Sequence, residues 1–311
     1  MDKILMNRTN YRGLSMLTRL NCIMRKKNII HIHPLFAIMI LLAIPSGFVI
    51  QALMLFGIVL LHEFGHVIVA KKYGYEIDKI TLLPFGGMAE LKDQSIGFHP
   101  RRESSIAIAG PAVNILLIPI GYIFTRSPLF SSYWNSFFLI NFWIFMFNML
   151  PALPLDGGRI IRAIRAREIG YEHATREAYQ MAIILSVLLF CFSVITFVVG
   201  KPHLGAFMLA IFLFVGALTG RKKVRLETMQ FLRNKHQNYP VTNSITSLAV
   251  SASASVRDAA LRCSPDRYML FYVLGDTGEI MGMIDESEIA TAVFRGDWMK
   301  SMEELLKELV R

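Results

Sequence analysis

Long apolar runs alternate with short polar segments along this chain, and the pattern predicts helices that cross a membrane. A helical span needs about 20 predominantly apolar residues. Runs of about this length occur at residues 34–50, 51–70, 104–125, 133–153, 178–200 and 203–220. The first two runs are separated only by a turn near Pro45-Ser46-Gly47, so together they predict a helical hairpin.

Basic residues gather on one side of these six predicted spans. If the N-terminus is cytoplasmic, the loops on the outside contain only Arg126 and Lys201. The segments on the inside contain clusters of lysine and arginine within residues 1–27, 71–102, 159–176 and 221–225. Cytoplasmic loops carry such an excess, so we predict a multi-pass protein of the cell membrane with both termini in the cytoplasm. We interpret residues 34–50 as an uncleaved anchor, because no small-x-small cleavage site follows the apolar run.

A strand-like segment lies between the second and third spans. Residues 75–92, YEIDKITLLPFGGMAELK, alternate around Pro84, Gly86 and Gly87. The segment is too short for a helical hairpin and too apolar for a plain loop. It predicts a β-hairpin that dips into the membrane, where protein or water must cover its backbone.

The polar C-terminal third predicts a separate domain. We expect a linker at residues 221–244 and a small cytoplasmic α/β domain at 245–311, after a membrane domain at 28–220 and a basic extension at 1–27. Residues 269–285, MLFYVLGDTGEIMGMID, predict two strands around a turn. The final helix places four apolar residues on one face, and these are Met302, Leu305, Leu306 and Leu309. The fold class is a polytopic α-helical membrane protein of about six spans, with a β-hairpin and this domain.

Composition agrees with a membrane protein. Of the 311 residues, 54% are hydrophobic and 18% are charged, whereas soluble proteins have about 25% charged residues. We attribute the net charge of +10 to cytoplasmic loops and expect no direct contact with nucleic acid. The three cysteines lie far apart without a CxxC motif, which argues against a disulfide framework or a cysteine zinc site.

The second span carries three ionisable residues, His62, Glu63 and His66. Residues four apart share one face of a helix, so both imidazoles can bind one metal ion. Glu63 lies beside that face, where it can take a proton from water activated by zinc. A chance match to H-E-x-x-H is the alternative. However, ionisable groups within a span are costly and are usually functional, which favours a Zn²⁺ site.

A catalytic zinc site needs a third protein ligand, and Asp156 is the best candidate. It lies in FNMLPALPLDGGRIIRAI at the inner end of the fourth span, on the same predicted side of the membrane as the second span's end. Asp-Gly alone is often just a turn. The flanking Asn148, Pro151 and Pro154 favour a functional segment.

Together these motifs resemble the site-2 protease family of intramembrane zinc metalloproteases. The likeness rests on His62-Glu63-x-x-His66 and Asn148-x-x-Pro151-x-x-Pro154-x-Asp156-Gly157, and it covers about residues 28–220. GPAVN at 110–114 also matches the family's third span, although small residues that allow close helix packing explain it equally well.

This resemblance implies a role for each matching residue. It implies that His62, His66 and Asp156 bind zinc, that Glu63 activates water, and that Asn148 lies near the scissile bond. It also implies that the substrate lies near a membrane-inserted loop and the proline-containing segment, whose matching residues are Gly86, Gly87, Pro151 and Pro154.

Residues 251–293 are similar to a cystathionine-β-synthase-type (CBS) domain. With six spans, this arrangement resembles the family's branch in endospore formers, which removes the pro-segment of a sporulation sigma factor. The resemblance implies a membrane-associated protein substrate, membrane-embedded inhibitory proteins, homo-oligomers formed through CBS-like domains, and a location in the mother-cell membrane around the forespore. CBS domains often bind ATP or another adenine nucleotide. Here Glu288 matches the residue that holds a ribose, but Asp285 replaces a hydroxyl residue and would repel phosphate, so nucleotide binding stays open.

We therefore predict an intramembrane zinc endopeptidase that works near the cytoplasmic face. A helical substrate must first become extended, and we expect it to pair with the strand at residues 80–90 by edge addition. The alternative is a polytopic metal transporter with a CBS regulatory tail, which would need polar residues along several spans. A catalytically inactive scaffold is a further alternative, against which the intact Glu63 argues.

Overall fold

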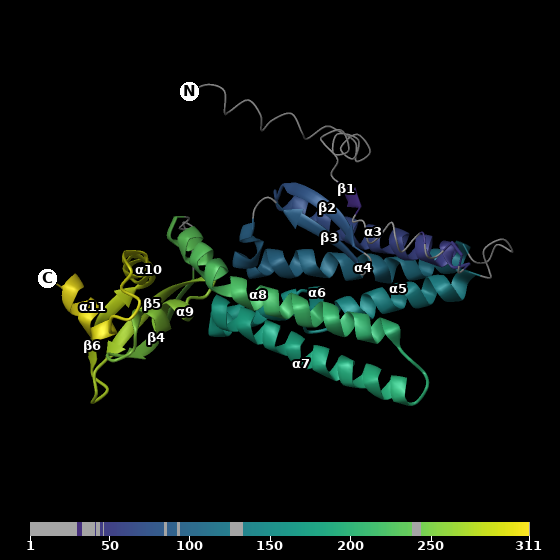
Figure 1. Ribbon diagram of the computed structural model, residues 1–311. Coiled ribbons are helices and arrows are strands. Elements are labelled where there is room, and N and C mark those ends of the chain that lie inside the picture. The colour runs from purple at the N-terminus through teal and green to yellow at the C-terminus, as the bar shows by residue number, and fades with distance from the viewer. Residues whose placement is uncertain are drawn as a thin grey trace, which may run out of the picture.

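The computed structural model describes residues 30–32, 41, 44–45, 47–83, 86–91, 94–124, 133–237 and 244–310. Long helices lie side by side, a small sheet lies against them, and an α/β module follows at one end (Figure 1). The elements before the module are β1 (Ile30–Ile32), α3 (Val49–Lys72), β2 (Ile77–Leu83), β3 (Gly86–Leu91), the 3₁₀ helix η1 (Gln94–Phe98), α4 (Pro100–Phe124), α5 (Trp134–Asn148), α6 (Asp156–Ile169), α7 (Tyr171–Val198) and α8 (Leu204–Gln237).

Four of the described helices, α3, α4, α7 and α8, are long and apolar enough to cross a membrane. Their outer faces carry large apolar side chains that no neighbouring helix covers. On α7, for example, Ile184, Leu188 and Ile195 are each 61% exposed. An apolar surface of this extent is stable in lipid but not in water, so the chain is a membrane protein, as its composition predicts.

The predicted fourth span, 133–153, is too long. Helix α5 ends at Asn148 and has 15 residues, which corresponds to about 22 Å, less than the roughly 30 Å of a bilayer core. The backbone leaves the helix because Pro151 and Pro154 follow, and proline excludes the helical conformation from the residue before it. The predicted first span, 34–50, lies mostly outside the described residues.

Two segments predicted as connections are helical. The basic segment after the fourth span forms α6, which buries Ala163 and Ala166 on one face. Helix α8 continues without a break from the last span through most of the predicted 221–244 linker. Residues 221–237 contain no glycine or proline and are rich in lysine and arginine, which favour the helix.

The predicted β-hairpin is present as β2 and β3. These strands pair antiparallel, with Leu83 opposite Gly86 and Leu82 opposite Gly87. The short strand β1 adds to β2 in parallel, an addition that the sequence did not predict because three residues carry no periodicity. The order β1-β2-β3 leaves β3 at an edge of the described sheet, and β3 also contacts α3.

The C-terminal module is built on a second three-stranded sheet. Its elements are β4 (Ser244–Ser251), α9 (Val256–Leu261), β5 (Arg267–Leu274), β6 (Ile280–Asp285), α10 (Glu286–Arg295) and α11 (Met302–Leu309). Strand β4 is parallel to β5, and β5 is antiparallel to β6, as the predicted hairpin requires. Gly278 gives the hairpin turn its positive φ of 85°. Met302, Leu305 and Leu306 are buried, whereas Leu309, the last residue of α11, is 44% exposed.

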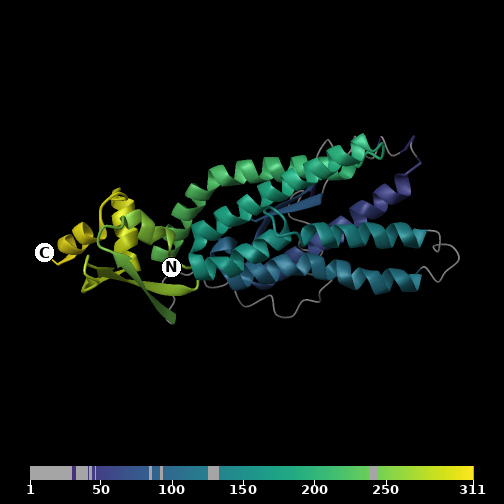
Figure 2. The ribbon, with the colours of Figure 1, turned by 90° about the horizontal axis from the view of Figure 1, so that it is seen from below.

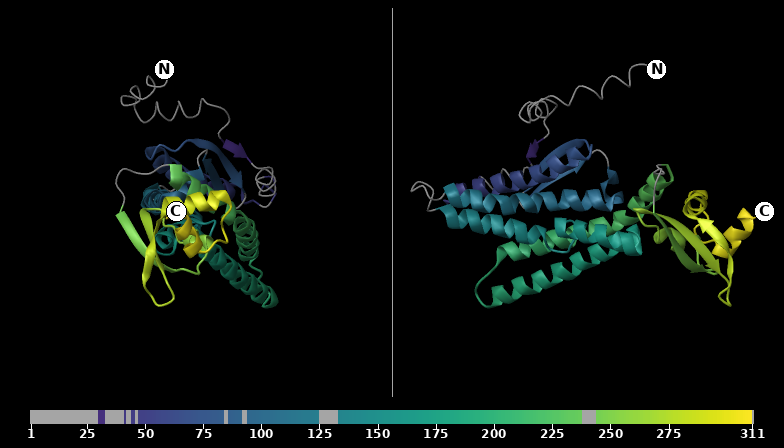
Figure 3. Two further views of the ribbon diagram at one scale, coloured as in Figure 1. Left: turned by 90° about the vertical axis from the view of Figure 1, so that its left-hand side faces the viewer. Right: turned by 180° about the vertical axis from the view of Figure 1, so that it is seen from behind.

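The module packs against the ends of the membrane helices (Figures 2 and 3). Phe98, Tyr171 and Phe231 form one aromatic group, with ring centroids 5.0 to 5.6 Å apart. This group belongs to the same buried cluster as the module residues Val256 and Cys263. The module core is therefore completed by residues of η1, α7 and α8.

Lys235, near the end of α8, fixes this helix to the module. Its Nζ donates to the carbonyl oxygens of Ser264 (2.6 Å) and Arg267 (2.7 Å) and pairs with the carboxylate of Glu286 at 2.5 Å. The Lys235 and Glu286 side chains are only 11% and 5% exposed. Burial raises the pKa of the Glu286 carboxyl, and the charge of Lys235 opposes part of that rise.

We predict that Lys235→Met destabilises the module. The substitution removes the cation that pairs with the buried Glu286 carboxylate and the donor to two carbonyls, and removing one partner of a buried ion pair typically costs about 3–5 kcal/mol. The melting temperature of the detergent-solubilised protein should fall, and trypsin should cleave the module faster. Lys223→Met, at an exposed position of the same helix, is the matched control; equal stability of the two variants would contradict the prediction.

Candidate metal centre

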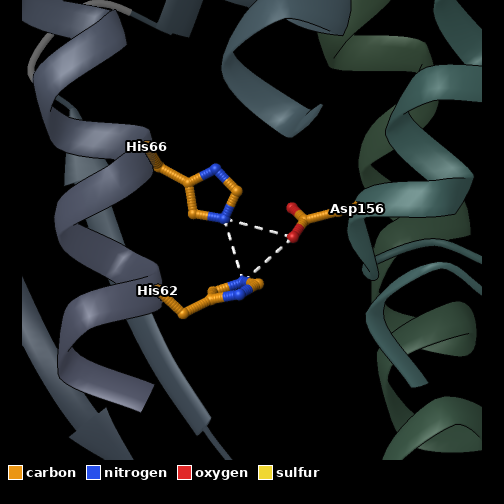
Figure 4. A group of neighbouring side chains, drawn as sticks. All are labelled: His62, His66 and Asp156. Atoms are coloured by element: carbon orange, nitrogen blue, oxygen red, sulfur yellow. Dashed lines mark hydrogen bonds and ion pairs between the residues drawn. The ribbon is translucent and has the colours of Figure 1, made fainter. Parts of the chain in front are cut away.

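Helix α3 presents His62 and His66 on one face, one turn apart, toward the first residue of α6, Asp156 (Figure 4). The three side chains are buried: His62 is 3% exposed, His66 6% and Asp156 5%. Within the described residues they are the group of histidine, cysteine or acidic side chains whose ligand atoms lie close enough to hold one metal ion. The predicted ligands from two helices therefore lie together.

The three ligand atoms form a nearly equilateral triangle. Oδ2 of Asp156 lies 3.1 Å from Nε2 of His62 and 3.1 Å from Nε2 of His66. The two Nε2 atoms are also 3.1 Å apart. Tetrahedral zinc with bonds of about 2.0–2.1 Å requires ligands about 3.3 Å apart. The triangle thus matches one face of a zinc tetrahedron, which fits three protein ligands and one open position.

The remaining polar atoms of these ligands have partners. Nδ1 of His66 donates to the backbone carbonyl of Ile106 at 2.7 Å, which leaves Nε2 of this ring as the atom with a lone pair. Nδ1 of His62 lies 2.5 Å from Oδ1 of Asn114. Oδ1 of Asp156 faces Arg159 at 3.7 Å. Each ligand is thus held by the polar atom that points away from the triangle, while its other polar atom faces the centre of the triangle.

Two glycines allow Asp156 to reach this position. A Cβ built at Gly157 would overlap the carbonyl of Met149, and one at Gly158 would overlap the backbone of Ala152. The start of α6 can therefore pack directly against the preceding irregular segment. The Asp-Gly-Gly sequence is more than a turn, because both glycines are required by close backbone packing.

Glu63 follows His62 on α3 and is 8% exposed. Its carboxylate is near enough to interact electrostatically with both histidines and with Asp156. Glu63 thus lies near the three ligands without belonging to the triangle.

Comparison with known proteins agrees with this geometry. The model of peptidase family M50 matches residues 50–129 and 124–194, the part of the chain that contains all three ligands. This segment of the chain belongs to peptidase family M50. Relatives of this chain include a zinc metalloprotease of Methanocaldococcus jannaschii, which is 33% identical over 181 residues, covering 57% of this chain and 51% of that protein.

A second relative is similar to this chain over nearly the whole length of both proteins. The stage IV sporulation protein FB of Bacillus subtilis is 27% identical over 283 residues, which is 89% of this chain and 96% of that protein. Among solved structures, a site-2 protease from Methanocaldococcus jannaschii matches with a TM-score of 0.50 and 29% identity. That match covers 62% of this chain and 90% of the solved one. The predicted family resemblance is confirmed.

The other predicted site residues of the membrane domain lie at the end of α5, in the segment between α5 and α6, and at the start of β3. Asn148, the last residue of α5, donates from Nδ2 to the carbonyl of Ile144 in its own helix at 3.1 Å. Pro151 is half-buried, and Pro154 is exposed. Gly86 and Gly87 begin β3, the edge strand that contacts α3. In the described part of the chain, no hydrogen bond joins Asn148 to the three ligands.

Three residues around the ligands of this chain were not predicted as site residues. Gly110 of α4 packs so closely that a Cβ there would overlap Nε2 of both histidines. Asn114 and Asn141 are fully buried and hydrogen-bonded to each other. The GPAVN match contained Gly110 and Asn114 without deciding their role. Asn141 could have been predicted as a site residue because it is a polar residue within an apolar stretch.

We predict that Gly110→Ala strongly lowers metal binding. The added methyl group would occupy the space in front of both Nε2 atoms, so the imidazoles can no longer converge on one ion. Zinc content of the purified protein, measured by elemental analysis, should fall well below that of the unsubstituted protein. Gly57→Ala is the matched control, because a Cβ there meets nothing within 4 Å. Normal zinc content in Gly110→Ala would contradict the described packing.

Proposed function

We propose that this chain is an intramembrane zinc endopeptidase that cleaves a membrane-associated protein near the cytoplasmic face. The observation that carries the proposal is the buried triangle of His62, His66 and Asp156 with Glu63 beside it. It lies in the segment that matches peptidase family M50. We assign zinc to the three ligands, because two imidazoles and a carboxylate suit zinc and leave the open position that catalysis requires.

Peptide hydrolysis assigns distinct tasks to the residues around the triangle. When bound, zinc supplies a Lewis acid that polarises the substrate carbonyl and makes water more acidic. Glu63 takes a proton from the attacking water and returns it to the leaving amine. Asn148 is proposed to lie near the scissile bond and to stabilise the oxyanion. For this, its amide must give up the hydrogen bond to the Ile144 carbonyl and donate to the substrate instead.

The substrate segment is proposed to bind as an extended strand beside β3. A helical backbone is hydrogen-bonded internally and has no free carbonyl for attack. Edge addition would hold the substrate extended through main-chain hydrogen bonds. The edge position of β3 and its contact with α3 support this proposal. Gly86 and Gly87 at the start of β3, and Pro151 and Pro154 beside Asp156, are the proposed substrate-binding residues.

The cytoplasmic side is proposed from the positions of the helix ends. Tyr75, just after α3, packs with Ile96 and Ile106 near the start of α4. Tyr171, at the start of α7, packs with Phe231 near the end of α8. Phe98, just before α4, packs with Tyr171 and Phe231 in the buried cluster that includes the module, so these ends lie on the module's side of the molecule. They carry the basic clusters that favour the cytoplasm. Both termini are proposed to be cytoplasmic.

The substrate is proposed to be the pro-segment of a sporulation sigma factor. The support is the similarity to the stage IV sporulation protein over 96% of that protein's length, together with the CBS-like resemblance of the C-terminal module. Membrane-embedded inhibitory proteins, homo-oligomers through the module and a location around the forespore are proposed on the same ground.

Nucleotide binding at the module gains no support from the structure. Oε2 of Glu288 accepts a hydrogen bond from the backbone N–H of Asp285 at 2.8 Å. The Asp285 carboxylate accepts from the N–H groups of Ser287 and Glu288, so it covers the start of α10. An anionic phosphate approaching there would meet two carboxylates. We therefore do not include an adenine nucleotide in the proposed function.

We predict that Glu63→Gln abolishes cleavage of a co-expressed membrane-associated sigma-factor precursor. Glutamine keeps the size of the side chain but cannot accept the proton from water, and loss of general-base catalysis typically costs about 10²–10⁴-fold in rate. Zinc content and membrane insertion should stay normal. Glu168→Gln, at an exposed position of α6, should cleave normally. Cleavage at a comparable rate in Glu63→Gln would refute the proposed role.

We predict that Asp156→Ala lowers the zinc stoichiometry of the purified protein. Two histidines alone leave the triangle incomplete, so the remaining site should lose metal to a chelator that the unsubstituted protein resists. Asp266→Ala removes a carboxylate that pairs with Arg167 far from the triangle, and its zinc content should be normal. If Asp156→Ala retains one zinc per chain, Asp156 is not a ligand.

A further inference from the structure

A buried pair of amide side chains joins α4 to α5 beside His62. Asn114 and Asn141 are both 0% exposed, and each lies within an apolar stretch of its helix. A buried amide without hydrogen bonds is costly, and polar groups within spans usually serve function. The proposed peptidase mechanism does not use this pair, so its place in the site needs an explanation.

The hydrogen bonds of the pair have only one consistent direction. Nδ2 of Asn141 lies 2.7 Å from the backbone carbonyl of Asn114, which can only accept. Oδ1 of Asn141 must then be the acceptor in its second contact, where Nδ2 of Asn114 donates to it at 2.7 Å. Oδ1 of Asn114 is therefore the atom that faces Nδ1 of His62 at 2.5 Å. This oxygen can only accept, so Nδ1 of His62 carries the proton.

This direction decides which nitrogen of His62 can bind a metal. A neutral imidazole with its proton on Nδ1 has its lone pair on Nε2. That atom lies 3.1 Å from both Asp156 Oδ2 and His66 Nε2. The backbone carbonyl of Asn114, acting through two amides, thus fixes both the tautomer and the rotation of the ring.

We propose that Asn114 and Asn141 are positioning residues that hold His62 ready for the metal. The inference rests on the proposed zinc site and deepens it. Asn114 bonds His62 directly, and Asn141 acts through Asn114 by fixing the orientation of its amide. In other proteins, hydrogen-bond partners of the ring nitrogen that does not bind the metal orient the metal-binding histidines. Loss of such a partner typically lowers metal affinity about 10–100-fold.

Helix packing alone does not account for the pair. The contact between α4 and α5 would be served by any two amides that bond each other. Here Asn114 uses its Nδ2 for the side-chain hydrogen bond to Asn141, so its Oδ1 faces Nδ1 of His62. His66 provides an independent comparison, because its Nδ1 donates to a second acceptor of α4, the Ile106 carbonyl.

The test measures zinc affinity in detergent by competition with a chelator of known affinity. Asn114→Leu removes the acceptor, and its zinc affinity should fall at least about tenfold. Asn114→Asp keeps an acceptor oxygen opposite Nδ1 and should retain most of the affinity. Asn141→Leu leaves Asn114 in place but frees its amide to turn, so its loss should be intermediate. Asn135→Leu, the same change at an exposed position of α5, should bind zinc normally.

Zinc affinity and melting temperature together distinguish a positioning role of the pair from a purely structural one. Unchanged affinity in Asn114→Leu, with zinc bound by the unsubstituted protein, would overturn the inference and leave the proposed zinc site intact. An equal loss of affinity in Asn114→Leu and Asn114→Asp, together with an equal fall in melting temperature, would make the pair merely structural. If the unsubstituted protein binds no zinc, the proposed function fails and this inference fails with it. Rescue by aspartate, but not by leucine, supports the positioning role even if Asn141→Leu folds poorly.

Discussion

The arrangement of the membrane helices depends on one constraint. Each polar atom of the ligands, which are buried among apolar helices, needs a hydrogen-bonding or ionic partner. His62, His66 and Asp156 are almost inaccessible to solvent, where an unpaired polar group or charge is costly. Their outer atoms are met by Asn114, Ile106 and Arg159. Their inner atoms converge on one small triangle. Because the outer contacts are satisfied by the protein, the inner atoms are left for a cation, which also balances the negative charge of Asp156.

Helix α6 connects this triangle to the rest of the molecule. Asp156 is its first residue, and the two glycines that follow let it pack against the segment after α5. In its middle, Arg162 pairs with Glu103 of α4, which is fully buried. At its end, Arg167 pairs with Asp266 of the module at 2.8 Å. Helix α6 therefore joins the ligand Asp156 at its start to α4 along its middle and to the module at its end.

The sequence predicted the features that depend on local patterns. H-E-x-x-H on a helix fixes the spacing of His62 and His66, and alternation predicts the hairpin of β2 and β3. It did not predict α6, because a basic segment between spans is equally typical of a loop. The membrane-facing length of α5 was overestimated, since apolar composition continues past the point where Pro151 and Pro154 end the helix. Contacts between distant segments, such as Asn114 with Asn141, leave no periodic signal in one sequence.

The sequence left two interpretations of GPAVN, close helix packing and a role in the site. Each applies to different residues of the same face of α4. Ile106, Gly110 and Asn114 follow one another at intervals of four, so they share one face of α4. His66 contacts Ile106 and His62 contacts Asn114, so α3 and α4 run antiparallel with two facing rows. Gly110 is the small residue that permits close packing, and it lies between two acceptors that each hold a histidine. A shift of one residue along α4 would turn all three positions away together. Close packing and ligand orientation are thus a single requirement on this face of α4.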